Sequence, residues 1–167
     1  MNNNVENSRV QICVTRFNNE TFKQNQSYRI ENKIKCIYGA PVKITEKILP
    51  STNIIVIEMN NSKNIIEGFG VIKNKLAPLP NTKRCHYIYN DNNYNRYIYK
   101  SNNRIDKDDL NKDEKRIIKN LELLLFKTKG HMKRGQGIQN IPNKIKKNVE
   151  FNYVKFLKEL YSSKEHK

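Results

Sequence analysis

NIIVIEMNNSKNIIEGFGVIK, residues 53–73, is the stretch that decides the fold of this 167-residue chain. Its first part, residues 53–59, is β-branched and mostly apolar, which is typical of a strand in a protein core. After a polar turn, Ile65–Lys73 predicts the returning strand of a hairpin. Gly68 and Gly70 lie inside that second strand, and glycines there indicate a bulge or a tight bend, as at a barrel corner. We therefore expect this hairpin to form the centre of a strongly curved sheet.

Weaker strand and helix signals precede the hairpin. Residues 10–17 alternate apolar and polar side chains, which predicts a first strand. Residues 20–33 have a weak apolar face and predict a short helix that crosses from the first strand to the next. Residues 35–44 contain the sequence Gly39-Ala40-Pro41, and we expect two short extended pieces around a turn there, because proline cannot donate to a sheet ladder.

A tyrosine-rich region follows the hairpin. Residues 84–89 and 94–99 predict a further hairpin around a polar turn at 90–93. The tyrosines have two interpretations. Half-buried rings are ordinary in strands, but some of these rings could also form a face on which nucleic-acid bases stack.

Two helices are expected in the last third of the chain. Residues 107–127 carry apolar side chains at helical spacing, and Asp106 is the expected N-cap of this long helix. A C-terminal helix is expected at about 149–161, capped by Asn148 or Asn152. Its apolar side chains share one face, so this helix should dock on the body of the protein.

These elements together predict an α+β fold, in which a small curved mixed or barrel-like β-sheet is flanked by two or three helices. The chain has the length of one domain. We expect a single domain over residues 9–161, a disordered tail at residues 1–8 and a frayed end at residues 162–167.

The chain is strongly basic. Lys and Arg total 32 against 16 Asp and Glu, so the net charge is +16. A field of that sign attracts polyanions. A genome rich in A and T would favour lysine codons over arginine codons, but it does not explain a twofold excess of bases over acids. We therefore expect a polyanionic partner.

The cysteines and the hydropathy pattern bear on compartment and on membranes. Cys13, Cys36 and Cys85 are scattered and form no CxxC pair, which favours free buried thiols in a reducing compartment. The histidines are also far apart, so no metal site is expected. No apolar run approaches the roughly 20 residues that a membrane helix needs. We expect a soluble intracellular protein without a cofactor or a membrane partner.

Residues 127–147, KTKGHMKRGQGIQNIPNKIKK, contain seven basic residues and no acid. Glycines in such a loop allow backbone N–H groups to converge on an anion, and Arg134 offers a bidentate fork for phosphate. The spacing matches neither a P-loop nor a dinucleotide-binding fingerprint. The alternative is that the glycines only route the chain while the cations stay solvated. We interpret this basic loop, residues 127–147, as a contact for phosphate.

The residues expected to contact nucleic acid come from the basic loop and from the tyrosine-rich region. Lys133, Arg134 and the amides of Gly135 and Gly137 would hold phosphate. Side chains from the tyrosine-rich region would supply a neighbouring stacking surface. The full set is Lys129, His131, Lys133, Arg134, Gly135, Gly137, Arg96, Tyr97 and Tyr99.

Residues 53–74 resemble the central hairpin of PUA-like domains, the superfamily of the ASCH, EVE and YTH families. Their common pattern is a strand, an interruption and an apolar-Gly-apolar-Gly-apolar strand, carried here by Ile66, Gly68, Phe69, Gly70 and Val71. The resemblance implies a small mixed barrel with flanking helices that binds RNA or modified nucleobases. The chain has no tryptophan, so an aromatic cage of the YTH or EVE type would need tyrosine or phenylalanine. The GxKxxExR motif of ASCH proteins is absent.

The overall composition of the sequence also resembles that of uncharacterised proteins of large DNA viruses with AT-rich genomes. That resemblance implies a location in the host cytoplasm or in the virion.

The expected function is nucleic-acid binding, with RNA ahead of DNA and a modified or flipped base among the candidate ligands. Binding without catalysis is favoured, because no Cys–His or Ser–His pair has a recognisable spacing. Two alternatives stay open. One is a nucleic-acid-processing enzyme that uses His131, with Arg134 beside it. The other is a basic structural virion protein whose charge neutralises a packaged genome.

Overall fold

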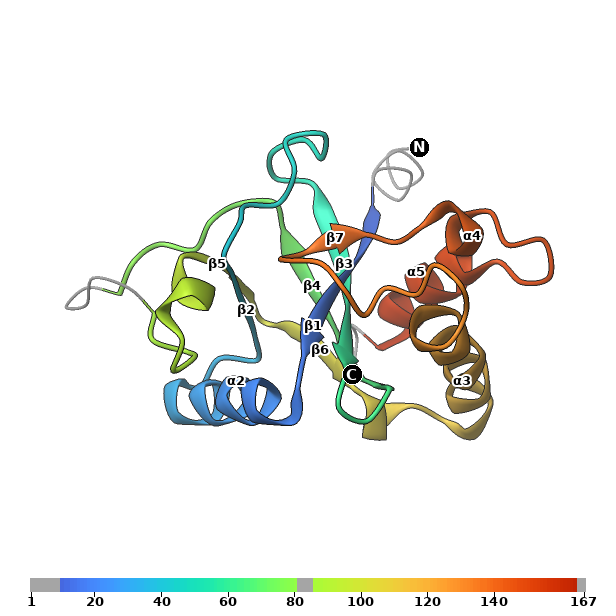
Figure 1. Cartoon of the computed structure of the whole chain (residues 1–167), viewed down its shortest axis with the longest axis horizontal. Helices are drawn as coiled ribbons and strands as arrows, with labels where there is room; N and C mark the ends of the chain where they lie inside the picture. The colour runs from blue at the N-terminus through green and yellow to red at the C-terminus, as the bar shows by residue number, and fades with distance from the viewer. Residues whose placement is uncertain (1–9, 81–85, 165–167) are drawn as a thin grey trace.

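A five-stranded mixed sheet forms the centre of the molecule (Figure 1). The computed structural model describes residues 10–80 and 86–164, so the expected tail at residues 1–8 lies outside the described residues. The strands of this sheet, in spatial order, are β6 (Asn103–Asp106), β4 (Ile65–Lys73), β3 (Asn53–Asn60), β1 (Gln11–Phe17) and β7 (Gln139–Asn140).

Both parallel and antiparallel pairs occur in this sheet. β3 pairs antiparallel with β4, so the expected central hairpin is confirmed. β1 runs parallel to β3, with Val14 opposite Ile57. A parallel pair needs a long crossover, and the chain supplies it through α2 (Asn19–Asn32), β2 (Cys36–Ala40) and residues 41–52. The prediction that a helix after the first strand carries the chain across is therefore confirmed.

A two-stranded antiparallel sheet lies against one face of the central sheet. It pairs β2 with β5 (Tyr97–Ser101). β5 continues past Asn102 directly into β6, which pairs with β4, so one extended segment passes from the small sheet into the large one. The seven strands thus follow one another as a curved ribbon that ends at β2 and at β7 and is not closed into a barrel.

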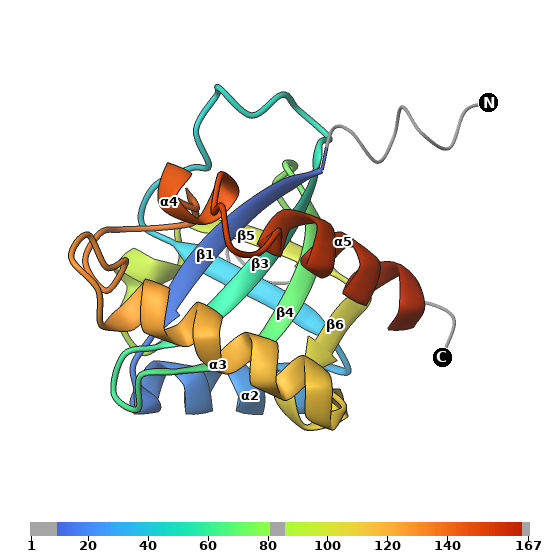
Figure 2. The same ribbon diagram turned by 90° about the vertical axis from the view of Figure 1, so that its right-hand side faces the viewer.

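Helices cover the opposite face of the central sheet. α3 (Lys112–Phe126), α4 (Asn143–Lys146) and α5 (Tyr153–Lys164) lie on that side, whereas α2 lies on the side of the small sheet (Figures 1 and 2). The core accordingly divides into two clusters. One packs one face of the central sheet against α3, α4 and α5, and the other fills the space between the two sheets. Side chains on both faces of β3 are buried, so this strand has no solvent face.

The two glycines of β4 have a packing reason. The register between β3 and β4 shifts at Glu58, where one extra residue of β4 forms a bulge. A Cβ atom at Gly70 would collide with the Tyr38 hydroxyl group, and one at Gly68 would collide with Arg104. The absence of side chains therefore allows two large polar residues to reach Glu58 across the strand.

Glu58, Tyr38 and Arg104 form a buried polar network between the sheets. Glu58 is 1 % exposed, and Arg104 donates to both of its carboxylate oxygens, over 2.9 and 2.6 Å. The Tyr38 hydroxyl donates to Oε1 over 2.8 Å. The Glu58 carboxylate raises the pKa of Arg104 against the lowering effect of burial. A buried charge that lost this partner would cost about 3–5 kcal/mol of stability.

The structure corrects the expected hairpin at 84–99. Residues 86–91 form no strand and residues 92–95 form a 3₁₀ turn, while β5 pairs with β2 instead. The other expected arm begins at residue 84, and residues 84 and 85 lie outside the described chain. Asn95 explains the preference for a loop, because its buried side chain accepts from the amides of Ile88 and Tyr89 and donates to the Tyr89 carbonyl. Those bonds hold a compact turn in place of a strand ladder.

Both expected C-terminal helices are present, with different bounds. The long helix begins at Lys112 instead of residue 107, because Asn111 and Glu114 form a capping box there. Asp106 caps the short 3₁₀ turn that precedes it. The last helix runs three residues beyond 161, to Lys164, so the frayed end expected at 162–167 is wrong for its first half. The amide of Lys155 is bonded to the Asn152 side chain, as expected of an N-cap.

Three further findings concern membranes, metals and thiols. Within residues 10–80 and 86–164, no helix is long and apolar enough to cross a membrane. The same residues contain no group of three His, Cys, Asp or Glu side chains that could hold a metal ion. Cys13 and Cys36 are free and buried, as expected, and burial raises the pKa of each thiol to about 12.

Candidate functional site

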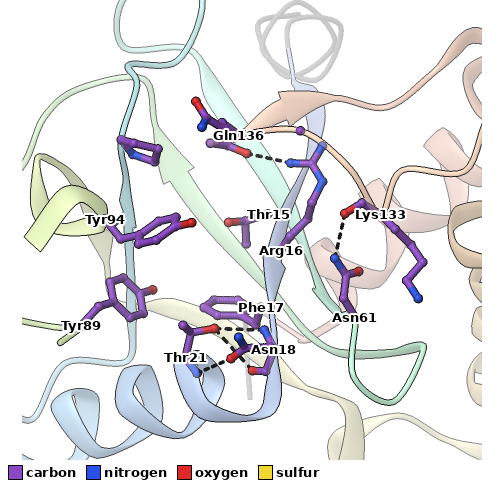
Figure 3. Close-up of a pocket in the computed structure, with 14 residues that line it drawn as sticks. Thr15, Arg16, Phe17, Asn18, Thr21, Asn61, Tyr89, Tyr94, Lys133 and Gln136 are labelled. Atoms are coloured by element: carbon purple, nitrogen blue, oxygen red, sulfur yellow. Dashed lines mark hydrogen bonds between the residues drawn. The ribbon is translucent and has the colours of Figure 1, made fainter. Parts of the chain in front are cut away.

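A cleft of about 280 Å³ lies where the strand ribbon stays open, between β1 and β2. One wall is the carboxyl end of β1 with the start of α2, and the other is the end of β2 with the loop that follows residue 86 (Figure 3). The basic loop forms the rim. The lining residues are Thr15, Arg16, Phe17, Asn18, Thr21, Gly39, Pro41, Asn61, Tyr89, Tyr94, Lys133, Gly135, Gln136 and Gly137, and none of them is acidic.

Arg16 is the cation that the β1 wall brings to this cleft. It is only partly exposed, and burial lowers the pKa of its guanidinium. Its Nε donates to the Met132 carbonyl over 2.6 Å, Nη1 donates to the Gly137 carbonyl over 3.2 Å, and Nη2 donates to Gln139 Oε1 over 2.6 Å. All three acceptors are neutral and belong to the basic loop. Arg16 therefore holds that loop against the central sheet.

The glycines of the basic loop make this close approach possible. Gly135 and Gly137 have φ values of 124° and 72°, a region that other residues rarely adopt. A Cβ atom at Gly135 would lie 2.7 Å from Gln139 Oε1 and 3.0 Å from Arg16 Nη2. One at Gly137 would lie 2.8 Å from a methyl group of Val42. These two glycines thus fold the loop over the Arg16 guanidinium and toward β2.

Two tyrosines form the opposite wall. Tyr89 is 6 % exposed, and its hydroxyl accepts from Asn25 Nδ2 over 3.1 Å, which fixes the ring. Tyr94 is 42 % exposed and packs edge-to-face on Tyr89, with ring centroids 6.3 Å apart. Figure 3 shows both rings extending toward Thr15, Arg16 and Phe17 on β1. The cleft thus has an accessible aromatic ring on one side and a cation on the other.

The first turn of α2 borders the cleft but has few free donors. The Asn18 side chain accepts from the Thr21 amide over 2.8 Å, and Thr21 Oγ1 accepts from the Asn18 amide over 3.0 Å. The Asn19 amide donates to Ser62 Oγ. This helix start therefore contributes the positive end of its dipole to the cleft, while most of its amides are already bonded.

Comparisons with family models, with curated proteins and with solved structures found nothing similar to this chain. The function must therefore be argued from the geometry of the site itself.

The cleft brings together part of the site expected from the sequence. Lys133, Gly135 and Gly137 line it. In Figure 3 the Lys133 side chain extends away from Tyr94, and its carbonyl accepts from Asn61 Nδ2 over 2.8 Å. The backbone of Lys133, more than its ammonium group, therefore shapes this part of the rim.

The other residues of the basic loop in the expected set lie outside the cleft lining. Lys129, His131 and Arg134 are exposed. His131 accepts from the Lys133 amide over 3.3 Å, which is a turn contact within the loop. These three side chains face solvent beside the cleft.

The expected stacking surface divides into two parts. Tyr99 is 2 % exposed, and its hydroxyl accepts from the Ile44 amide, so it belongs to the core. Tyr97 is partly exposed, with the cations of Lys43 and Arg96 within 5.6 and 5.8 Å of its ring centre. Arg96 and Tyr97 follow Tyr94 closely in sequence but do not line the cleft.

Four residues that supply the charge and the aromatic rings of the cleft are not in the set expected from the sequence: Arg16, Phe17, Tyr89 and Tyr94. One signal for Arg16 was available, since it is the only charged residue in the otherwise apolar and neutral segment of residues 10–17. A charged side chain in a core strand is costly to bury unless hydrogen bonds or an ion pair compensate it, so such a residue is a candidate for a special role. No local signal separated Tyr94 from Tyr99, because their difference in exposure depends on how β5 pairs with β2.

Proposed function

We propose that this protein binds nucleic acid and that the cleft between β1 and β2 receives one unpaired base. The observation that carries the proposal is that Tyr94 and the glycine-rich part of the basic loop face the same cleft, which has no acidic lining residue. A base can stack on an aromatic ring without regard to its identity. Neighbouring phosphates of the same strand would remain at the positively charged rim.

The composition of the cleft wall suits a base better than an apolar ligand. Gln136 places an exposed carboxamide at the cleft, and a carboxamide can both donate to and accept from the edge of a base. A volume of about 280 Å³ is at the small end for ligand sites, which suits a single nucleotide unit of a strand better than a larger molecule. A modified or flipped base therefore remains among the candidate ligands, with RNA ahead of DNA.

We also propose that the chain is a divergent PUA-like domain. The curvature of the strand ribbon and the placement of Gly68 and Gly70 beside buried polar side chains support this reading, whereas the open edge of the ribbon departs from the barrel that the resemblance implies. Relatives of this chain that lacked the apolar-Gly-apolar-Gly-apolar pattern of residues 66–71 would contradict it.

A catalytic role for His131 gains no support from the geometry. The side chain is exposed, lies outside the cleft lining and accepts a hydrogen bond from an amide of its own loop. Replacing His131 with Ala should therefore leave nucleic-acid binding nearly unchanged. Turnover of a nucleic acid by the wild-type protein, abolished by this substitution, would favour the enzymatic alternative.

The binding proposal is tested by replacing Tyr94 with Ala. The loss of the stacking ring should weaken binding of a single-stranded RNA oligonucleotide by about 1–3 kcal/mol. Fluorescence anisotropy titrations with labelled RNA and DNA of one sequence would measure the change and rank the two ligands.

Tyr87→Ala is the matched control, since Tyr87 is 55 % exposed and does not line the cleft. Equal affinities of the Tyr94 and Tyr87 variants would place the base elsewhere. Absence of binding to both RNA and DNA at low salt would remove the proposed function altogether.

A further inference from the structure

The guanidinium groups of Arg16, Arg29 and Arg104 are partly or largely buried; of these, Arg104 has a carboxylate partner, and Arg16 is the one that lines the cleft. Arg104 donates to Glu58 and to Asp106 over 2.6 to 2.9 Å. Among residues 10–80 and 86–164, no carboxylate lies within ion-pair distance of Arg16. Its guanidinium is partly buried against neutral oxygens only. A charge in that setting is stabilised by any anion that can reach it.

Arg16 also has donors to spare. A guanidinium carries five N–H groups, and the three hydrogen bonds of Arg16 leave two N–H groups without a partner in the described part of the chain. Because Arg16 lines the cleft, an anion inside the cleft can reach these groups. The first turn of α2 could not replace Arg16 there, because most of its amides are bonded within the capping box and to Ser62.

The other positive side chains of the basic loop are less well placed than Arg16 to bind an anion inside the cleft. The Lys133 ammonium extends away from the tyrosines (Figure 3), and Arg134 does not line the cleft. The wall opposite Arg16 is Tyr94, so an anion at Arg16 would belong to a ligand that also has a flat ring. A nucleoside phosphate has both parts, a base for Tyr94 and a phosphate for the fork of Arg16.

We propose that Arg16 forms a phosphate subsite inside the cleft, so that the unit bound there is a nucleoside together with its own phosphate. The inference rests on the proposed function and adds to it the chemical class of the bound unit. The phosphate has two possible sources, the monoester of a free nucleotide or strand end and the diester inside a strand. Both present oxygens that accept from the two spare N–H groups.

The test compares ligands that differ only in the phosphate. Adenosine and adenosine 5′-monophosphate are titrated into the full-length protein by calorimetry in one low-salt buffer. The monophosphate should bind at least about tenfold more tightly, as expected when charge-assisted hydrogen bonds are added. The same comparison with dinucleotides that carry only the internal diester, or a 5′-phosphate as well, separates the two sources.

Two arginine variants then test whether Arg16 causes the preference for the monophosphate over adenosine. Arg16→Gln should abolish the preference for the monophosphate, while Arg116→Gln, a change of an exposed arginine on α3, should keep it. Because Arg16 also holds the basic loop, circular dichroism and thermal unfolding would check that the variant folds. If the Arg16→Gln variant does not fold, the ligand series on the wild-type protein still decides.

The outcomes separate this inference from the function on which it rests. Equal binding of adenosine and its monophosphate, or an unchanged preference in a folded Arg16→Gln variant, would overturn the phosphate subsite even if RNA binds well. Tight binding of the monophosphate without any RNA or DNA binding would instead overturn the proposed function and leave the subsite standing.

Discussion

The absence of a side chain at Gly70 leaves room for two buried groups in the interior of this protein. The hydroxyl of Tyr38 and the thiol of Cys36 occupy the space that a Cβ atom at residue 70 would need. Both groups are buried, so neither can move aside into solvent. The same placement lets the Tyr38 hydroxyl reach Glu58. Gly70 therefore supports the buried network without being part of it.

Gly70→Ala should lower the free energy of unfolding by about 1–3 kcal/mol, because a methyl group would be forced into a packed interior. Urea denaturation followed by circular dichroism measures the loss. Tyr38→Phe removes the hydroxyl that occupies the space, so the added cost of Gly70→Ala should be smaller in that background. Equal costs in the two backgrounds would show that Tyr38 is not the group that is displaced.

At the scale of single elements, α3 shows how a capping motif sets the start of a helix. Asn111 Oδ1 accepts from the Glu114 amide over 2.9 Å, and Glu114 Oε2 accepts from the Asn111 amide over 2.8 Å. Glu114 also pairs with Lys164 of α5, over 3.2 Å. The cap thus positions a carboxylate that links the two long helices on this face of the sheet.

Asn111→Ala should destabilise the protein by about 1 kcal/mol, since an unsatisfied amide is left at the helix start. Lys112→Ala, on the next residue, is exposed and makes no capping contact, so it should change stability by less than about 0.5 kcal/mol. Thermal unfolding of both variants gives the comparison. A change for Lys112→Ala as large as that for Asn111→Ala would mean that the cap does not fix the helix start.

At the scale of the whole molecule, basic residues outnumber acidic residues two to one. In the described parts of the chain, the cations within 4.0 Å of a carboxylate include Arg104, Lys107, Lys155 and Lys164. The full chain has 32 Lys and Arg and a net charge of +16. A surface of that kind concentrates polyanions by its field, in addition to any contact inside the cleft.

Binding of nucleic acid should therefore weaken steeply with salt, by roughly 0.7–0.9 in log affinity per log unit of salt for each phosphate neutralised. The double variant Lys129→Gln, Arg134→Gln in the basic loop should reduce that slope. The control pair Lys112→Gln, Lys115→Gln removes the same charge at the far end of α3. Titrations at several salt concentrations measure the slopes, and an equal reduction by both pairs would contradict a contact localised at the loop.

The sequence by itself determined the central hairpin, the α+β class and most of the helices. Residues 53–73 form β3 and β4 as expected, because β-branched residues and local turn signals act between neighbours in the chain. The placement of glycines also pointed correctly to a bulge. Local patterns could do this because hairpins and helices are made of short-range contacts.

Only the tertiary structure decided which residues share the cleft. Arg16, Tyr94 and Gly137 are far apart in sequence, and they meet because β1 and β2 face each other across the open side of the strand ribbon. The pairing of β5 with β2 buried Tyr99 and left Tyr94 accessible. Such long-range pairing depends on the burial of whole faces rather than on local propensity, which is why Tyr94 could not be chosen from the sequence.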